Sequence, residues 1–343
     1  MAGDRSTVTK SVPGNLADDD HPFITGGLVK STPTPRVAEY ENVKISSEGI
    51  LFQQDLIMSE SFAREENFRR FKRKRTFKRY EQSVKLRPTR TIESAVWVTD
   101  DWSKGYFHWL ADVLPKLVIG AARLRSSPLL LPARFRDSDL AKSSLEMLGI
   151  RNIEFVEPHE AVVVRRLYLP IHTAESGDFD ASVIREVRRI FRRAAPEDGS
   201  PARRVYISRA CAKRRKIVNE NEVSDVLRDH GFETVIAEGL TFEQQVRLFS
   251  SARHLVSIHG AGLSNMLFMP EGSRVMEFRK NDPRSAECFS NMSAAFGHKF
   301  YIQPCRATDE DQAPYSADLI VDSQLLEKNL EQFLLERTRP SST

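Results

Sequence analysis

The sequence has few cysteines and no long apolar run, and these features limit the classes of protein to which it can belong. Its 343 residues contain three cysteines, Cys211, Cys288 and Cys305, which are far apart and odd in number. This argues against a disulfide framework or a cysteine zinc site and suits a reducing compartment, so we expect a cytoplasmic protein. No run of about 18 apolar residues is present, and the N-terminus has no apolar signal-peptide core. Neither a membrane span nor export by the usual route is therefore expected.

The chain also lacks a strong excess of charge of one sign. Lys and Arg number 51 against 47 Asp and Glu, which gives a net charge of +4, whereas a nucleic-acid binder usually shows a larger excess. One basic segment stands out within residues 62–80, FAREENFRRFKRKRTFKRY, and its pattern is that of a basic amphipathic helix. Three interpretations stay open: a solvated helix docked through its Phe residues, a contact with an anionic membrane or acidic partner, and a nucleic-acid contact. The residues expected to make a membrane contact are Arg69, Arg70, Lys72, Arg73, Lys74 and Arg75.

Most of the chain alternates apolar strand-like runs with amphipathic helical stretches. Strict alternation of this kind predicts parallel sheets covered by helices, and 343 residues suffice for two such domains. Turn-forming residues from Pro196 to Pro201 indicate the boundary between them. The predicted division is a poorly ordered tail (1–38), an N-terminal Rossmann-like domain (39–195), a C-terminal Rossmann-like domain (202–305), and a segment (306–343) whose helix from Ser323 to Leu335 packs back on the N-terminal domain.

The sequence contains no Gly-x-Gly-x-x-Gly, no Walker loop and no Gly-x-Ser-x-Gly elbow, so dehydrogenases, P-loop enzymes and serine hydrolases are weak candidates. What it does contain is an apolar run, Leu255 to Ile258, that ends abruptly in His259-Gly260-Ala261-Gly262. Small residues after a strand let the backbone approach a ligand, and a helix that starts there directs free N–H groups at an anion. We expect a phosphate site here. Glu277, near the end of the next apolar run, is placed to contact a ribose or base.

A second candidate constellation follows another strand, Arg204 to Ser208. Arg209 falls at the C-terminal edge of the sheet, where ligands bind in doubly wound folds, and a guanidinium there suits bidentate phosphate contact. The basic residues from Lys213 to Lys216 come next, and a solvated loop is the alternative interpretation for them.

A third constellation is the pair His108 and Asp112, which are four residues apart and share a helix face. A carboxylate on such a face, among aromatic and aliphatic neighbours, is a candidate general base. The alternative is that Asp112 forms an ion pair with Lys116, also four residues away, while His108 caps or packs. A metal site at this pair lacks a third ligand nearby.

Taken in order, these motifs resemble the family 61 glycosyltransferases over roughly residues 95–305. The resemblance rests on three ordered boxes: His-Trp-Leu-x-Asp-x-Leu-Pro at 108–115, Ile207-Ser208-Arg209 with Arg215 and Asn219-Glu220, and Leu240-Thr241-Phe242-Glu243-Gln244-Gln245 leading to the His259 loop. It implies a GT-B fold, in which two Rossmann-like domains with parallel sheets face a cleft. It also implies a nucleotide-sugar donor on the C-terminal domain, an acceptor on the N-terminal domain, and inversion at the anomeric carbon.

The resemblance also assigns residues. It implies that Asp112 is the base, with His108 beside it, and that the diphosphate is bound by Arg209, Arg215 and the loop His259, Gly260, Ala261, Gly262 and Asn265. No Asp-x-Asp pair stands near this loop. Two arginines and a helix N-terminus supply roughly +2.5 charges, comparable to one divalent metal, so we expect no metal cofactor. The predicted function is an inverting glycosyltransferase that acts in surface polysaccharide or glycolipid synthesis. The alternatives are a nucleotide-sugar epimerase on the same fold and a non-catalytic basic interaction protein.

Overall fold

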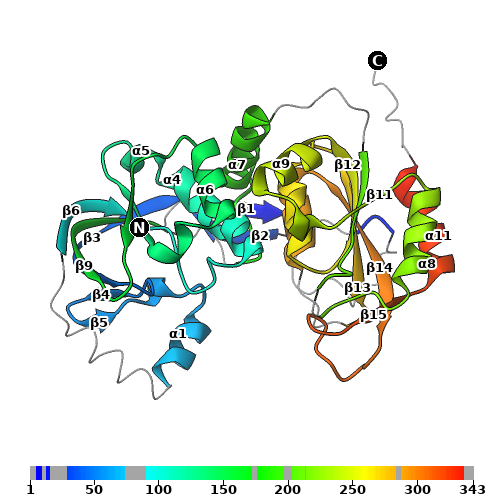
Figure 1. The fold of residues 1–343 in the computed structure, drawn as a ribbon, viewed down its shortest axis with the longest axis horizontal. Helices are drawn as coiled ribbons and strands as arrows, with labels where there is room; N and C mark the ends of the chain where they lie inside the picture. Colours follow the sequence, from blue (N-terminus) through cyan, green and yellow to red (C-terminus); the bar gives the residue numbers. More distant parts are fainter. Residues whose placement is uncertain are drawn as a thin grey trace. The chain divides into compact units, whose positions relative to one another are not determined.

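The computed structural model describes residues 5–9, 13–15, 29–73, 90–171, 176–195, 203–212, 214–282 and 287–335. The chain forms two compact units (Figure 1). Unit 1 comprises Met1–Val8, Lys30–Ala195 and Thr241–Glu243, and unit 2 comprises Thr9–Val29, Pro196–Leu240 and Gln244–Thr343. The predicted boundary residues, Pro196 to Pro201, lie outside the described residues, as do Lys74, Arg75 and Lys213 of the basic segments.

Unit 1 is built on a mixed sheet with the strand order β5-β4-β3-β9-β6-β7-β8. Strands β9, β6, β7 and β8 are parallel, whereas β3 pairs antiparallel with β9, and β4 and β5 continue as hairpins. The bounds are β3 Arg36–Ser46, β4 Leu51–Gln53, β5 Leu56–Ile57, β6 Arg90–Val96, β7 Leu129–Pro132, β8 Ile153–Val156 and β9 Ala161–Ile171.

The antiparallel part of this sheet corrects the expectation of a purely parallel N-terminal sheet. Its β4–β5 connection is the two-residue turn Gln54-Asp55, with φ values of +50° and +60°. These left-handed angles fit a type I′ hairpin, which is usually signalled by Asn-Gly or Asp-Gly. Because Gln-Asp is not that signal, the sequence pattern missed the hairpin. The predicted tail also contains regular structure, since β1 Arg5–Thr9 pairs with β2 Val29–Pro33 and β3 begins at Arg36.

Helices α4, α5, α6 and α7 lie along one side of this sheet (Figure 1). The helical stretch that contains His108 and Asp112 runs from Tyr106 to Leu124 and is divided. Its parts are α3 Tyr106–His108, the π-helix η3 Trp109–Val113, α4 Leu114–Ile119 and α5 Ala121–Leu124. Gly120 separates the last two because a Cβ there would lie 2.9 Å from Pro170 of β9. The other helices are α1 Glu65–Lys72, η2 Ser59–Ser61, η4 Ala133–Phe135, α6 Asp139–Met147 and α7 Ala181–Ala194.

Unit 2 contains a sheet with the order β11-β10-β12-β13-β14-β15, parallel except for the antiparallel edge strand β15. Helices α8 and α11 cover one face, and α9 lies on the other (Figure 1). The strands are β10 Arg203–Ile207, β11 Glu233–Val235, β12 Ala252–Ile258, β13 Arg274–Lys280, β14 Lys299–Ala307 and β15 Leu319–Val321. The helices are α8 Glu220–Asp229, η5 Ala237–Gly239, α9 Phe242–Ser250, η6 Ala261–Phe268, α10 Cys288–Phe296 and α11 Ser323–Leu334.

The prediction that the last helix packs on the N-terminal domain is wrong. Leu326, Leu330 and Phe333 of α11 are buried in the core of unit 2, and Phe333 stacks on Phe232. The apolar stripe of α11 was read correctly, but a stripe specifies burial and not the partner.

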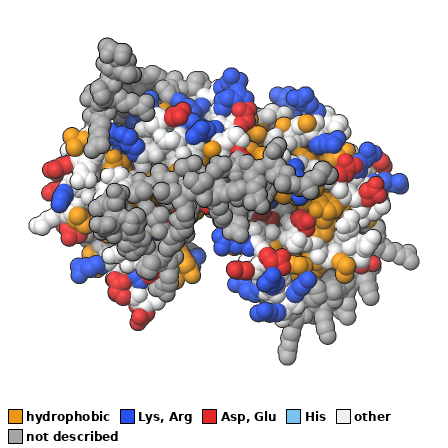
Figure 2. Space-filling model, turned by 180° about the vertical axis from the view of Figure 1, so that it is seen from behind, with side chains coloured by type: hydrophobic (Ala, Val, Ile, Leu, Met, Phe, Trp, Pro, Cys, Tyr) orange, Lys and Arg blue, Asp and Glu red, His pale blue; other side chains and the backbone are white. Residues whose placement is uncertain are grey.

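Charged side chains of both signs are mixed on the described surface that Figure 2 displays. Figure 2 shows Lys and Arg side chains interspersed with Asp and Glu on the face it displays, as expected for a net charge of +4. No described helix is long and apolar enough to cross a membrane.

Candidate functional site

Two arginines of unit 2 converge on the backbone of the His259 loop. Arg209 follows β10, and a Cβ built on Gly260 would lie 3.2 Å from its Nη1 and 3.8 Å from Nη1 of Arg215. Arg215 Nη1 also donates a hydrogen bond to the carbonyl of His259 at 3.2 Å. The loop therefore needs glycine at position 260 because the two guanidinium groups occupy the space beside it. The structure thus brings Arg209, Arg215 and this loop together.

The two arginines have no carboxylate partner among the described residues. Arg209 donates only to the carbonyl oxygens of Arg214 and Arg215, and neither Arg209 nor Arg215 forms an ion pair with a described carboxylate. Burial lowers the pKa of Arg215, and the nearby charges of Arg209 and Arg214 lower it further. The Arg215 backbone has φ = +58°, a strained conformation for a residue with a side chain, and such outliers cluster at functional sites. This arrangement is suited to binding an anion.

His259 is held in place by a buried carboxylate. Its Nδ1 hydrogen-bonds Glu277 Oε1, which is fully buried in β13, and its ring packs edge-on against Phe289. With Nδ1 engaged by Glu277, the other ring nitrogen, Nε2, is the one left to face a ligand. Nη1 of the buried Arg279 lies 3.9 Å from the second oxygen of Glu277.

This geometry changes the interpretation of Glu277. Strand β13 continues to Lys280, so Glu277 lies inside the strand, opposite Ser257, and not at its end. One of its oxygens is engaged by His259, and the side chain has no exposed surface. We therefore assign Glu277 to the orientation of His259 and not to ribose contact.

The helix after the loop is a 3₁₀ helix, which is more tightly wound than an α-helix and rises further per residue. Residues Ala261–Phe268 form a 3₁₀ helix, η6, whose first N–H groups have no acceptor within the helix. Gly262 is required because a Cβ there would lie 3.3 Å from Ile207. Asn265 is fully buried and donates to Gln245 and to the Gly262 carbonyl. Its amide supports the loop, so the predicted diphosphate contact of Asn265 is replaced by a structural role.

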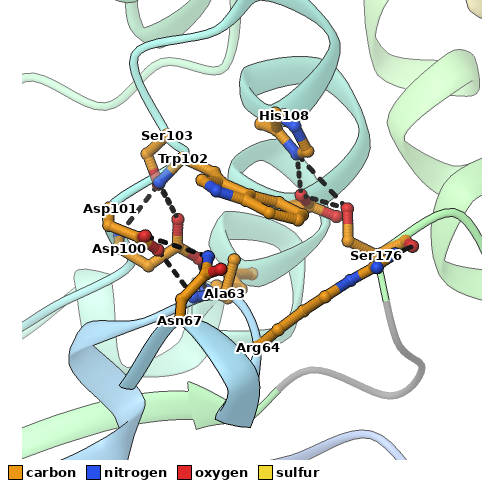
Figure 3. Close-up of polar contacts among 11 residues, drawn as sticks. Ala63, Arg64, Asn67, Asp100, Asp101, Trp102, Ser103, His108 and Ser176 are labelled. Carbon is orange, nitrogen blue, oxygen red and sulfur yellow. Dashed lines mark hydrogen bonds and ion pairs between the residues drawn. The ribbon is translucent and has the colours of Figure 1, made fainter. Parts of the chain in front are cut away.

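In unit 1, His108 and Asp112 form a hydrogen-bonded pair (Figure 3). His108 Nδ1 lies 2.8 Å from Asp112 Oδ2, and Ser176 Oγ donates to the same oxygen at 3.1 Å. Asp112 lies in the π-helix η3, and such segments occur frequently at functional sites. The side chain of Asp112 is only 2% exposed, whereas that of His108 is 25% exposed. The imidazole is thus the member of the pair that solvent or a substrate can reach.

The alternative pairing of Asp112 with Lys116 is wrong. Lys116 Nζ lies 3.2 Å from Oδ2 of Asp100, and both side chains are buried. Asp100 and Lys116 form a separate ion pair, and the Asp112 carboxylate contacts His108 and Ser176.

Trp102 connects this pair to helix α1. Its indole lies between the imidazole of His108, with ring centroids 4.7 Å apart, and the guanidinium of Arg64, 5.2 Å from the ring (Figure 3). Arg64 also donates to the Ser176 carbonyl at 3.2 Å. The neighbouring Asp101 accepts hydrogen bonds from Ala63 N and Asn67 Nδ2, and desolvation of its carboxylate raises the pKa of Asp101. The start of α1 is therefore fixed beside His108.

Sequence reasoning missed Ser176, Arg64, Trp102 and Arg279. Ser176 lies 64 residues from Asp112 in a loop without periodicity, so no sequence signal brings the two together. Trp102 lies in an aromatic-rich stretch of the sequence, which only weakly indicates a functional residue. Among the described residues, no group of three or more His, Cys, Asp or Glu side chains is placed to hold a metal ion.

Fold and site together define a class: an α/β protein with a glycine-containing loop and two arginines at the carboxyl edge of a parallel sheet, and a histidine–carboxylate pair in a separate unit. Comparison with known proteins gives the family. Residues 106–276 match the Glycosyltransferase 61 family, and the chain belongs to it.

The chain is also similar to a β-1,2-xylosyltransferase, XAX1, from Oryza sativa subsp. japonica. The two are 37% identical over 82 residues, which cover 24% of this chain and 14% of that protein. The match thus spans about one seventh of the length of that relative.

Proposed function

We propose that this protein transfers a sugar from a nucleotide-sugar donor to a saccharide or glycolipid acceptor, with inversion at the anomeric carbon. The observation that carries the proposal is the pair Arg209 and Arg215, two partly buried cations without a carboxylate partner among the described residues, set against Gly260. Family membership adds a donor of the nucleotide-sugar class to this geometry.

The proposed role of unit 2 is to bind the donor diphosphate. Breakage of the bond between the anomeric carbon and the phosphate oxygen leaves its electron pair on the phosphate. Arg209, Arg215 and the first N–H groups of η6 would stabilise that charge, while His259, as an imidazolium whose Nδ1–H is bound by Glu277, would donate from Nε2. Their summed charge of roughly +2.5 is comparable to that of a divalent metal, and we therefore propose a metal-independent reaction.

The proposed role of unit 1 is to remove the acceptor proton. An acceptor hydroxyl loses its proton as its oxygen forms a bond to the anomeric carbon on the face opposite the departing phosphate, which inverts that centre. The sequence alone favoured Asp112 as the base. Because Asp112 is buried behind His108, we propose that Nε2 of His108 takes the proton and that Asp112 orients and stabilises the imidazolium.

A role in surface polysaccharide or glycolipid synthesis is the proposed biological setting, at the cytoplasmic side of a membrane. The described part of the basic segment supports the docked-helix interpretation, because Phe68 is buried in a cluster with Ile50, Phe52 and Phe62. Arg69, Arg70, Lys72 and Arg73 remain as a contact for anionic lipid, which we propose as a secondary, peripheral interaction. Loss of salt-sensitive binding to anionic vesicles on replacement of these four residues by Gln would test it.

The central proposal is tested by donor binding. Thermal unfolding of the full chain in the presence of UDP, GDP, CMP and their sugar conjugates should show a rise in Tm with one nucleotide class, because a ligand of the native state stabilises it. Arg209→Gln and Arg215→Gln should each weaken binding by roughly ten- to a hundredfold. Arg228→Gln is the matched control, since Arg228 is exposed on α8 and paired with Asp225 of the same helix. If no nucleotide raises Tm, or if the control loses as much affinity, the proposal is wrong.

A further inference from the structure

A cavity of about 340 Å³ lies in unit 1, next to the start of α1. Its wall comes from β3, the η2–α1 segment, the residues after β6, helix α4 and the end of β9. The volume falls in the roughly 300–1,000 Å³ range of small-molecule sites. We call it the α1 cavity.

The wall of the α1 cavity carries hydrogen-bond donors that the protein does not use. Thr99, 1% exposed, lines it, and its Oγ1 has no hydrogen-bond partner among the described residues. Lys116, 7% exposed, also lines it, and its ammonium donates only to Asp100 although it carries three N–H groups. Both residues line the same cavity. Because buried polar groups are normally satisfied, the unpartnered hydroxyl of Thr99 and the remaining N–H groups of Lys116 indicate a ligand that supplies acceptors.

The charges around the α1 cavity indicate which ligand. Its lining includes three cationic side chains, Arg36, Arg64 and Lys116, and three acidic ones, Glu60, Glu65 and Asp100. The formal charges cancel. Tyr40 donates to Glu60, while Leu169 and Pro170 add apolar surface. A wall of alternating donors and acceptors with an apolar side, and no net charge, suits a neutral molecule that carries both hydroxyl groups and C–H faces.

The α1 cavity is connected to the His108–Asp112 pair by shared residues. Lys116 is one helical turn from Asp112 and also borders the small void beside Asp112. Arg64, at the cavity rim, stacks on Trp102 and donates to the carbonyl of Ser176, whose hydroxyl contacts Asp112 (Figure 3). A ligand in the cavity that touches Arg64 is therefore connected to the His108–Asp112 pair through Ser176.

We propose that the α1 cavity is a subsite for a neutral saccharide and that Thr99 and Lys116 are the residues that recognise its hydroxyl groups. In the context of the proposed glycosyltransferase, on which this assignment rests, the occupant is part of the acceptor. The proposal deepens that function by naming an uncharged, hydroxyl-rich acceptor in place of a phosphorylated or uronic-acid one.

Binding of oligosaccharides to the full chain, without nucleotide, tests the proposal. The neutral probes are xylotetraose, cellotetraose and mannotetraose, and the acidic probe is tetragalacturonate, with affinity measured by NMR titration. The key variant is Thr99→Val, which keeps the side-chain shape and removes the hydroxyl. Because that hydroxyl has no partner in the protein, the variant should keep the Tm of the wild type. Thr91→Val, on exposed β6 and outside the cavity, is the matched control.

We expect at least one neutral probe to bind, with roughly two- to tenfold weaker binding in Thr99→Val and unchanged binding in Thr91→Val. Lys116→Met should abolish binding, but it leaves Asp100 buried and unpaired, so Thr99→Val is the decisive variant. Absence of neutral binding, a preference for the acidic probe, or equal affinity in Thr99→Val would overturn the proposal.

The same samples separate this proposal from the one on which it rests. Arg209→Gln should leave saccharide binding unchanged while it weakens nucleotide binding. If saccharides bind through Thr99 but no nucleotide binds to the wild type, the transferase proposal fails and the subsite stands. If nucleotides bind but saccharides do not, the subsite fails alone.

Discussion

The two candidate sites differ in whether their charged side chains have partners of opposite charge. In unit 1, His108 is paired with Asp112, and Lys116 with Asp100, so each charged group has a partner within the protein. In unit 2, Arg209 and Arg215 are brought together without a carboxylate among the described residues. A compensated pair is suited to moving a proton, whereas uncompensated cations are suited to binding an anion. The contrast supports our proposal that the two units carry out different steps of one reaction.

The unit 2 arrangement also has a cost that the unit 1 arrangement does not. Arg215 combines a left-handed backbone with a guanidinium whose pKa is lowered by burial and by like charges. Such strain persists only where the surrounding structure enforces it. A bound diphosphate would offset it, because each charge-assisted hydrogen bond contributes about 1.5 to 3 kcal/mol.

The largest effect is expected from the unit 1 pair. Asp112→Asn and His108→Ala should each reduce transfer by about 10² to 10⁴-fold, since general-base catalysis contributes on this scale, with little change in nucleotide affinity. Added imidazole should restore part of the activity of His108→Ala, because this side chain is the exposed member of the pair. Steady-state kinetics and nucleotide titration provide the measurements.

The control for this experiment is Asp55→Asn, an exposed carboxylate of unit 1 paired with Lys44. Near-normal turnover in Asp112→Asn would show that the base lies elsewhere. A loss of nucleotide affinity equal to the loss of turnover would erase the contrast between the two units.

The next largest effect concerns His259 and the carboxylate behind it. His259→Ala should weaken nucleotide diphosphate binding by roughly ten- to a hundredfold, the value of one charge-assisted hydrogen bond. Glu277→Gln should cost less, about tenfold, because it acts only through the orientation of His259. Calorimetry on both single variants and the double variant measures the coupling. We expect the double variant to bind no more weakly than His259→Ala, whereas additive losses would indicate that Glu277 contacts the ligand itself.

A smaller effect separates the two glycines of the loop. Gly260 is extended, with φ = 168°, so Gly260→Ala adds no backbone strain but presses on Nη1 of Arg209. We expect nucleotide affinity to fall by up to roughly tenfold, with an unchanged Tm. Gly262→Ala should instead lower the unfolding free energy by about 1 kcal/mol, because its Cβ meets the buried Ile207. Equal effects of both variants on affinity would contradict the proposed position of Arg209.

The comparison of units also shows where sequence reasoning succeeded. Strand β8 and helix α7 coincide with an apolar run and an amphipathic stretch of the sequence, because the alternation of such segments is a local signal. Arg209 and the His259 loop could be placed together because the carboxyl ends of neighbouring parallel strands share one edge of the sheet.

What failed depended on contacts that are distant in sequence. The antiparallel strands β3 to β5 lack a strong turn signal, and the partner of α11 is not encoded in its apolar stripe. Lys116 does not pair with Asp112, four residues away. It pairs with Asp100, which lies 16 residues from it. The burial of Asp112 behind His108, which changes the proposed base, follows from packing and could not be read from four-residue spacing.

The smallest expected effect is that of metal removal. If Arg209, Arg215 and the N-terminus of η6 neutralise the leaving phosphate, a divalent ion has little charge left to stabilise, and it would be repelled by the two guanidinium groups. Excess EDTA should then change the transfer rate by less than about twofold. The informative control is Arg215→Gln, which removes one positive charge: if added magnesium or manganese partly restores this variant but not the wild type, cation and arginine perform the same task. Complete loss of wild-type activity in EDTA, with recovery on addition of either metal, would show that unit 2 does not supply the charge by itself.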